Sequence, residues 1–437
     1  MTGGFCLPYV NSYRMKKKKP TTSVFTSFWK ILGPGLVTGA SDDDPSGIAT
    51  YSQAGAAYGL STLWTALITF PLMASIQEMS ARIGLVTSHG LAGTLKKHYS
   101  KPVLYLMLLF SFPAIVMNIG ADIAGMGAVG NLLVPSVHAI FFSIGFTVLL
   151  LILIVFLPYR KIASILKYLC ITLLVYLVVP FLYKQDWMVV LKSTLIPHIT
   201  FDKNFISILV AILGTTISPY LFFWQATMEV EDAKLLKKHL VVDKKVISAM
   251  KKDVDFGMLF SNLVMFFIIL TTGTVLFNAG IHQIDTVEQA AKALQPLAGN
   301  AAYLLFAIGV IGTGLLAIPV LCGSLSYIVT ETFGWEEGLD KKFYQAKAFY
   351  LIVIISLVLG LLMNYIGISP IKALIYSAIL YGVTAPVMIA IILHISNNKQ
   401  IMGTNTNGRM SNILGVAAFI LMTAAAITLL YMQLTGK

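Results

Sequence analysis

Three consecutive carboxylates near the N-terminus are the side chains of this 437-residue chain best suited to chemistry. Asp42, Asp43 and Asp44 stand in the segment 33–47, among glycines and directly before Pro45, inside an apolar stretch. A charged side chain at membrane depth is costly and therefore faces protein or a water-filled cavity. Proline and glycine free backbone carbonyls, which join the carboxylates as oxygen donors. Such donors suit hard cations such as Mg2+, Ca2+ and Mn2+.

A second apolar stretch is interrupted by a proline beside small hydroxyl residues. It covers residues 214–225 and lies five apolar segments after the first interruption. Thr215 and Ser218 could contact an ion or its waters, or could simply return hydrogen bonds to the freed carbonyls. Broken helices at corresponding positions of two five-helix halves are typical of inverted-repeat transporters, whose binding site lies near the bilayer midplane.

Composition excludes most soluble classes of protein. Hydrophobic residues make up 57% of the chain and charged residues 11%, and the mean hydropathy is +0.81, whereas soluble proteins carry about 25% charged residues. The net charge of +12 is spread over short basic clusters between apolar runs, so it indicates membrane orientation rather than nucleic-acid binding. The three scattered cysteines predict neither a disulfide framework nor a zinc site.

The apolar runs predict one all-helical domain with eleven membrane spans. Residues 1–30 are predicted to be a cytoplasmic tail, and 31–433 a single transporter domain. Most basic residues of the predicted loops fall on one side, which places the N-terminus in the cytoplasm and the C-terminus outside. The predicted spans are 31–57, 60–84, 102–131, 137–158, 163–183, 203–233, 254–279, 301–333, 345–363, 369–395 and 412–433. The first five and the next five spans, 31–183 and 203–395, are the predicted inverted repeats, and 412–433 is an added helix.

Three segments give the chain a resemblance to a known family. Asp-Pro-Ser-Gly at 44–47, Ser-Pro-Tyr at 218–220 and the segment 81–92 are similar to sequences of the Nramp family of divalent metal transporters. The resemblance is closest to the branch of Nramp-related magnesium transporters and covers nearly the whole predicted membrane domain. It implies a LeuT-type fold of five plus five inverted-repeat helices and an eleventh helix, with helices one and six broken. It also implies a multi-pass cell-membrane protein that moves ions by alternating access and is not an enzyme.

Departures from the family pattern bear on the ion. Typical members have asparagine where this chain has Gly47, and methionine where it has Ser218. A thioether favours transition metals, so Ser218 favours a harder ion. Because Mg2+ sheds its waters reluctantly, a widened site predicts transport of partly hydrated Mg2+, and of Mn2+ as well. The candidate metal-site residues are Asp44, Ser41, Gly47, Thr215 and Ser218.

The same resemblance implies transport that is not coupled to protons. Typical proton-coupled members have histidines in helix six, where this chain has Tyr220 and Gln225. Of their acidic pair in helix three only Asp122 remains, because the partner position is Gly125, and no arginine lies in the predicted ninth span. The residues assigned to the permeation path or to gating are Asp42, Asp43, Ser46, Tyr220, Trp224, Gln225 and Asp122.

Several assignments have a structural alternative. Asp44 could merely cap the half-helix that follows it, and Tyr220, Trp224 and Gln225 could be packing residues. Glu78 and Arg82 are one helical turn apart, which predicts a structural ion pair.

Other functions were weighed against magnesium transport. A proton-coupled Mn2+ or Fe2+ transporter is the first alternative, and an amino-acid transporter of the same architecture is the second, although Asp44 would repel a substrate carboxylate. A membrane prenyl-transferring enzyme would need a second acidic cluster, which the later spans do not offer. The predicted partners are therefore the metal ion and the lipid bilayer, without nucleic acid, cofactor or obligate protein partner.

Overall fold

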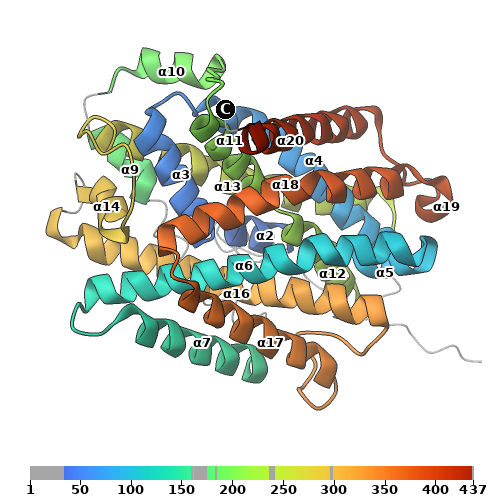
Figure 1. Ribbon diagram of the computed structural model, residues 1–437. Helices are drawn as coiled ribbons and strands as arrows, with labels where there is room; N and C mark the ends of the chain where they lie inside the picture. The colour runs from blue at the N-terminus through green and yellow to red at the C-terminus, as the bar shows by residue number, and fades with distance from the viewer. Residues whose placement is uncertain are drawn as a thin grey trace, which may run out of the picture. The chain divides into compact units, whose positions relative to one another are not determined.

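The computed structural model describes residues 34–158, 161, 175–182, 185–235, 242–295 and 299–435, and within these residues it contains helices and no strands. Gly33–Lys437 form one compact unit, shown in Figure 1. The predicted tail 1–30 and most of the predicted span 163–183 lie outside the described residues. The helices are α2 (Pro34–Asp42), α3 (Pro45–Tyr58), α4 (Trp64–Thr87), α5 (Leu91–His98), α6 (Lys101–Leu133), α7 (Ala139–Phe156), α9 (Val175–Leu182), α10 (Trp187–Leu195), α11 (Lys203–Thr216), α12 (Pro219–Leu235), α13 (Lys244–Val275), α14 (Val287–Ala291), α16 (Ala302–Phe333), α17 (Lys347–Met363), α18 (Pro370–Asn397), α19 (Lys399–Met402) and α20 (Arg409–Thr435), with short 3-10 turns at Lys292–Leu294, Gly299–Ala301 and Asn364–Ile366.

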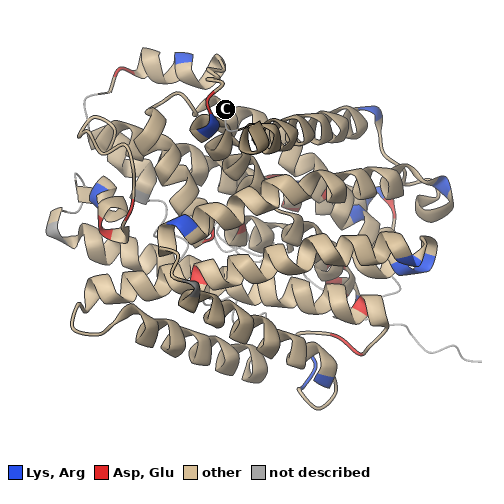
Figure 2. Ribbon diagram, viewed as in Figure 1, with Lys and Arg blue, Asp and Glu red and all other residues tan. Residues whose placement is uncertain are grey.

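In the described part of the chain, seven helical segments are long and apolar enough to cross a membrane. One of the seven consists of α11 and α12 together. α17 is apolar too, but shorter. Figure 2 shows that Lys and Arg gather at helix ends and in connections, while the helix interiors are nearly free of charge. The count of eleven spans and their grouping into two repeats remain predictions.

The helix α13 begins at Lys244, before the predicted span 254–279, whose membrane boundaries remain a prediction. Asp243 caps this helix, because its side chain accepts hydrogen bonds from the backbone N–H groups of Lys245 and Val246, both at 2.9 Å. Lysine is also a good helix former, so α13 continues beyond its apolar part.

Helical structure stops and restarts at both interruptions. α2 ends at Asp42 and α3 begins at Pro45, while α11 ends at Thr216 and α12 begins at Pro219. A proline has no backbone N–H to donate and has a fixed φ, so it fits the first position of a helix and not the interior. Each interruption therefore leaves backbone polar groups that need partners outside their own helix.

The α2–α3 pair lies in backbone contact with α13. A Cβ added to Gly39 would lie 2.1 Å from the carbonyl oxygen of Gly257, and one added to Gly55 would lie 2.7 Å from the backbone nitrogen of Gly273. Such distances are shorter than van der Waals contact, so only glycine allows this approach. α13 thus covers one side of the α2–α3 interruption.

The other side of the interruption faces α6 and α18. α6 packs along α16 and α18, and α18 packs along α11, as the side-by-side helices of Figure 1 show. α3 also contacts α6 and α18. Residues 43–44 therefore lie between α13 and the α6–α18 layer, which is the arrangement that builds the site.

Candidate metal-binding site

Asp44 is fixed by hydrogen bonds to both of its carboxylate oxygens. Oδ1 accepts from the Gly47 N–H at 2.7 Å and from the Ser46 hydroxyl at 2.8 Å, and Oδ2 accepts from Nδ2 of Asn118 at 2.8 Å. Asp44 is thus the N-cap of α3, and its role as a metal ligand stays a prediction. A carboxylate has about four lone-pair sites, so a capping Asp44 still has capacity for a cation.

Asn118 links Asp44 to Asp122 and to α18. Its amide Nδ2 lies 3.4 Å from Oδ2 of Asp122, and its carbonyl Oδ1 accepts from the Ser377 hydroxyl at 2.9 Å. Asp122 Oδ1 is buried and finds no hydrogen-bond partner among the described residues. Asn118 and Ser377 were missed from the sequence, although Asn118 and Asp122 are polar residues one turn apart in an apolar helix, which is a usable signal.

Asp42 and Asp43 turn toward α13 instead. The Ser261 hydroxyl donates to Oδ2 of Asp42 at 2.6 Å and lies 3.4 Å from Oδ1 of Asp43. Both carboxylates are essentially inaccessible, with 1% and 0% exposed. Oδ1 of Asp42 and Oδ2 of Asp43 have no partner within the described ranges. Ser261 was also missed, because nothing near it in sequence distinguishes it from other serines of the apolar helices.

The two interruptions face each other. A Cβ on Gly47 would lie 3.4 Å from the Thr215 hydroxyl oxygen, and the Tyr220 hydroxyl donates to the Ser41 carbonyl at 3.1 Å. The hydroxyls of Tyr51 and Thr216 are 3.0 Å apart. Contacts between α2–α3 and α11–α12 therefore bring most of the predicted metal-site residues into one region.

The hydroxyls of two predicted ligands, Ser218 and Ser41, bond to backbone carbonyls three or four residues before them. The Ser218 hydroxyl donates to the carbonyls of Gly214 at 3.1 Å and Thr215 at 2.5 Å, and the Ser41 hydroxyl donates to the Val37 carbonyl at 2.8 Å. This is the arrangement expected of residues that satisfy freed carbonyls. Direct contact of Ser41 or Ser218 with an ion stays a prediction.

The predicted gating residues of α12 are buried. Trp224 packs against α16, since a Cβ on Gly323 would lie 2.8 Å from its ring. Gln225 accepts from the Thr38 hydroxyl at 2.5 Å and donates to Glu229 at 2.9 Å, which joins α2 to α12. A packing role therefore accounts for their contacts in the structure.

Four buried carboxyl groups gather at the centre. Asp42, Asp43, Asp44 and Asp122 are all at most 1% exposed, and no ion pair of the described residues includes any of them. Ionised carboxylates without compensation are unfavourable in such surroundings. A cation with oxygen ligands would compensate them, but the described residues contain no group of three or more His, Cys, Asp or Glu side chains that could hold a metal ion as they stand.

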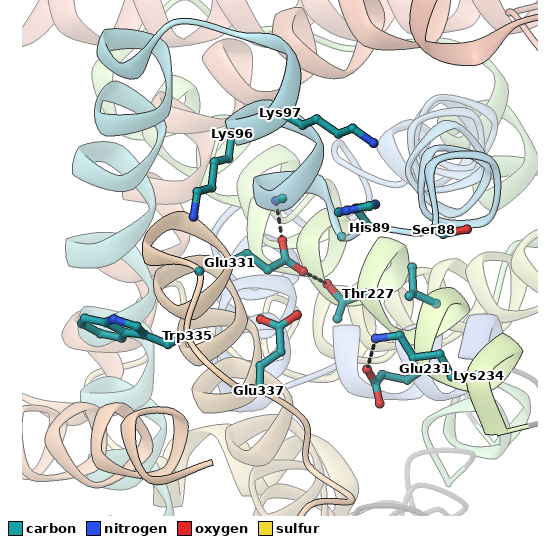
Figure 3. Close-up of a pocket in the computed structure, with 14 residues that line it drawn as sticks. Ser88, His89, Lys96, Lys97, Thr227, Glu231, Lys234, Glu331, Trp335 and Glu337 are labelled. Atoms are coloured by element: carbon teal, nitrogen blue, oxygen red, sulfur yellow. Dashed lines mark hydrogen bonds and ion pairs between the residues drawn. The ribbon is translucent and has the colours of Figure 1, made fainter. Parts of the chain in front are cut away.

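A second group of acids, Glu231, Glu331 and Glu337, lines a cavity of about 570 Å3 near the C-terminal ends of α12 and α16. Glu331 accepts from the Gly93 N–H at 2.7 Å and from the Thr227 hydroxyl at 3.2 Å, and so joins α5, α12 and α16, as Figure 3 shows. A Cβ on Gly90 would lie 1.9 Å from Glu331 Oε1, so the α4–α5 connection wraps closely around this carboxylate. Burial raises the pKa of the neighbouring Glu337 above its ordinary value.

The predicted pair of Glu78 and Arg82 is confirmed. Arg82 donates to both carboxylate oxygens of Glu78, at 2.9 and 3.2 Å, and both side chains are at most 7% exposed. Arg82 also donates to the Asn405 carbonyl at 2.7 Å and the Asn407 side chain at 2.6 Å. The pair therefore ties α4 to the connection between α19 and α20.

The sequence profile described as "Natural resistance-associated macrophage protein-like", abbreviated Nramp, matches residues 35–432. A relative described as "Divalent metal cation transporter MntH", from Granulibacter bethesdensis, is 23% identical over 404 residues, which are 89% of this chain and 86% of the relative. The matched region thus includes both interruptions and all the helices that pack around them.

Two solved structures share the arrangement of helices. The Eremococcus coleocola manganese transporter superposes with a TM-score of 0.70 at 18% identity, over 93% of this chain and 87% of the other. MhsT in complex with L-phenylalanine gives a TM-score of 0.61 at 12% identity, over 92% and 98%. At these identities the likeness shows the fold alone, which is the predicted all-helical LeuT-type fold of membrane transporters.

Proposed function

The chain belongs to the Nramp family, and from this premise we propose that it carries a divalent metal cation across the membrane by alternating access. The observation that carries the proposal is the buried group of four carboxylates at the α2–α3 interruption, which no described basic side chain neutralises. The relative from Granulibacter bethesdensis bears the name of a divalent metal cation transporter, in agreement with this charge.

Asp44 is the central ligand in this proposal. It lies at the end of the α2–α3 interruption, is held by Asn118 of α6, and stands beside Gly47, which faces Thr215 of the second interruption. An ion bound there would lie next to α6 and to the second interruption at α11–α12. Its binding energy would therefore depend on how these elements are arranged, as alternating access requires.

Two ions are candidates. Manganese is favoured by the likeness to the Eremococcus coleocola manganese transporter. Magnesium is favoured by Gly47 and Ser218, since neither residue offers the amide or thioether ligand of typical family members. The Ser218 hydroxyl is already engaged with carbonyls of α11. Both ions accept an all-oxygen site.

From the distribution of basic residues, we also propose that the N-terminus is cytoplasmic and the C-terminus external.

We further propose that transport is not coupled to protons. Tyr220 and Gln225 stand where typical members have histidines, and in this chain they form hydrogen bonds to Ser41 and to Thr38 and Glu229. These residues do not titrate near neutral pH, so they provide no proton carrier at those positions.

The test is uptake into proteoliposomes that report Mg2+, Mn2+ and internal pH in parallel. Uptake of either ion by the natural chain, lost in Asp44→Ala, would support the proposal. Uptake of Mn2+ but not Mg2+, with acidification, would select the proton-coupled alternative. Uptake of neither ion by a folded protein would overturn the proposal.

The double substitution Gly47→Asn with Ser218→Met sharpens the choice of ion. It restores the side chains of typical members, so uptake should shift toward Mn2+ and Mg2+ uptake should fall. An unchanged ratio of the two uptake rates would show that these positions do not set selectivity. The single substitution Ser324→Ala is a matched control, since this buried hydroxyl bonds only within α16, to the Val320 carbonyl at 2.7 Å.

A further inference from the structure

Helix α13 begins with a basic extension that precedes its apolar part. Residues 244–252 of this helix lie before the predicted span 254–279 and include four exposed lysines: Lys244, Lys245, Lys251 and Lys252. Nine helical residues extend about 14 Å, whereas the headgroup layer on one side of a bilayer is about 5–8 Å thick. The extension is therefore long enough to cross the whole depth of the lipid headgroups.

Two of the lysines share one face of α13 with exposed apolar residues. Lys252 follows Lys245 by seven residues, Leu259 follows Lys252 by seven, and Leu263 follows Leu259 by four. These spacings keep all four residues on one face of a helix. Ser248 is exposed on the same face, between the lysines, and Leu259 and Leu263 are 48% and 41% exposed. We call these five residues the α13 stripe.

The opposite face of α13 packs on the rest of the protein. Met250 and Val254 are 6% and 0% exposed, and Gly257 is in backbone contact with α2. These contacts begin within the extension and continue into the apolar part of the helix. The extension is therefore held against the bundle, with the α13 stripe facing outward.

The neighbouring acids do not neutralise the lysines of the stripe. Asp253 accepts a hydrogen bond from the backbone of α2 at 2.7 Å, and Asp255 lies within electrostatic reach of Lys251, one turn away. In the ranges that the structure describes, no ion pair includes Lys245 or Lys252. Both ammonium groups are therefore available to a partner outside the chain.

We propose that the α13 stripe binds an anionic phospholipid. Its phosphate lies at Lys245, Ser248 and Lys252, and an acyl chain follows Leu259 and Leu263. Two ammonium groups and a hydroxyl are suitable donors for phosphate oxygens. The lysines are about 10 Å apart along the helix, a separation that two flexible four-carbon side chains can close on a phosphate between them.

The order of charge and apolar surface selects this partner. A phospholipid carries its charge at one end and hydrocarbon at the other, as the stripe does. A zwitterionic headgroup brings its own cation, which the lysines repel, whereas phosphatidylglycerol has a net negative charge. A soluble acidic protein would meet only the lysine end, because Leu259 and Leu263 belong to the predicted span. The two ends together therefore favour an anionic lipid.

The test titrates the purified full chain in detergent with dioleoylphosphatidylglycerol and, separately, with dioleoylphosphatidylcholine, and native mass spectrometry counts the bound lipids. The natural chain should bind the phosphatidylglycerol more tightly. Lys245→Gln with Lys252→Gln should weaken that binding about 30-fold, roughly fivefold for each lysine near an anionic lipid, and should leave phosphatidylcholine binding unchanged. Glycerol 3-phosphate, which has the charge without acyl chains, should not displace the bound phosphatidylglycerol.

Lys244→Gln with Lys251→Gln is the matched control. It removes the same charge from the same extension, but each of these lysines lies about 100° around the helix from its neighbour in the stripe. The control should therefore lose clearly less affinity for phosphatidylglycerol. All four positions are exposed, so thermal unfolding without added lipid should be unchanged in both double variants.

Three outcomes would overturn the proposal. Equal binding of the two lipids by the natural chain would remove the charge selectivity. Equal losses in the two double variants would assign the attraction to the overall charge of the extension rather than to the stripe. Displacement by glycerol 3-phosphate would identify a site for free phosphate groups and not for a lipid. None of these results depends on metal transport, so the proposed function is tested separately.

Discussion

Two groups of buried acids differ in their partners: one comprises Asp42, Asp43 and Asp44 at the α2–α3 interruption with Asp122 of α6, and the other comprises Glu78 of α4 and Glu331 of α16. Glu331 and Glu78 are fully supplied with donors from neighbouring elements. Asp42, Asp43 and Asp122 each keep an oxygen without a partner among the described residues. Glu331 and Glu78 therefore join helices to one another. The unpartnered oxygens of Asp42, Asp43 and Asp122 can still accept a hydrogen bond or bind a ligand that the chain itself does not supply.

The largest effect is expected at Arg82. Arg82→Ala removes the partner of buried Glu78, and leaving such a charge alone costs about 3–5 kcal/mol. Thermal unfolding in detergent should show this loss, while Mn2+ binding per folded molecule stays at the natural value. Lys292→Ala, at an exposed pair whose Lys292 Nζ and Glu288 oxygen are 3.9 Å apart, is the control and should change little. Loss of Mn2+ binding in folded Arg82→Ala would show that the Glu78–Arg82 pair also affects the metal site, and would contradict its assignment to a purely structural role.

Asp44→Asn should show the opposite pattern. Removal of the charge is expected to lower the affinity for Mn2+ at this site about 100-fold, or about 2.7 kcal/mol. Stability in the absence of metal should fall less than in Arg82→Ala. Asparagine keeps an oxygen for the Gly47 N–H and leaves no unpaired charge, but its amide group replaces the acceptor of the Asn118 amide. Affinity comes from Mn2+ titration and stability from thermal unfolding. A variant that unfolds easily but binds Mn2+ normally would assign Asp44 to the structural class.

Glu331→Ala should lower stability by a smaller amount. The Gly93 N–H and the Thr227 hydroxyl lose their acceptor, and each unsatisfied donor costs about 1–3 kcal/mol if water does not reach it. The neighbouring cavity makes water available, so the lower end of that range is expected. Thermal unfolding measures the loss, and Glu288→Ala, at the exposed pair with Lys292, is the matched control. A loss of metal uptake without a loss of stability would contradict the structural role.

The smallest effect concerns two neighbouring acids of the α16–α17 connection. Burial raises the pKa of Glu337, so its contribution to stability is present below the ordinary value of 4.5 and is lost as pH rises through the raised pKa. The hydrogen bond and charge of Lys341 lower the pKa of Glu336, whose contribution is present above 4.5 and is lost as pH falls through the lowered pKa. Glu337→Gln should remove the first dependence and Glu336→Gln the second.

Unfolding free energies measured from pH 3 to pH 8 will distinguish the two variants. Glu337→Gln should gain stability relative to the natural chain at the alkaline end of this range, and Glu336→Gln should not. The same sign of change in both variants would show that the charge of the whole connection matters, rather than the surroundings of each acid.

Local sequence was sufficient for the features that depend on neighbouring residues. Pro45 and Pro219 each begin a helix after an interruption, and Asp44 could be assigned as a cap. Glu78 and Arg82 could be paired because four residues separate them on one helix. These relations follow from backbone geometry over a single turn.

Contacts between distant segments could not be predicted in this way. Asn118 is 74 residues from Asp44, and Ser261 is 219 residues from Asp42. Ser261 does not stand out locally, since the apolar helices contain other serines that bond only within their own turns. The spacing of Asn118 and Asp122 marks Asn118 as unusual, but it does not show that Asn118 reaches Asp44. The division of four acids into two pairs depends on which helices pack on each side of residues 43–44, and only the assembled fold determines that.

The glycine contacts between α2–α3 and α13 have a mechanical consequence. Side chains between two helices act as a compliant layer that can repack when one helix is displaced. Gly39 and Gly257 leave no such layer, because backbone meets backbone there. We therefore expect α2 and α13 to move together as one rigid body. A displacement of either helix, caused by the lipid or by an inhibitor bound beside it, would also displace the carboxylates at the α2–α3 interruption.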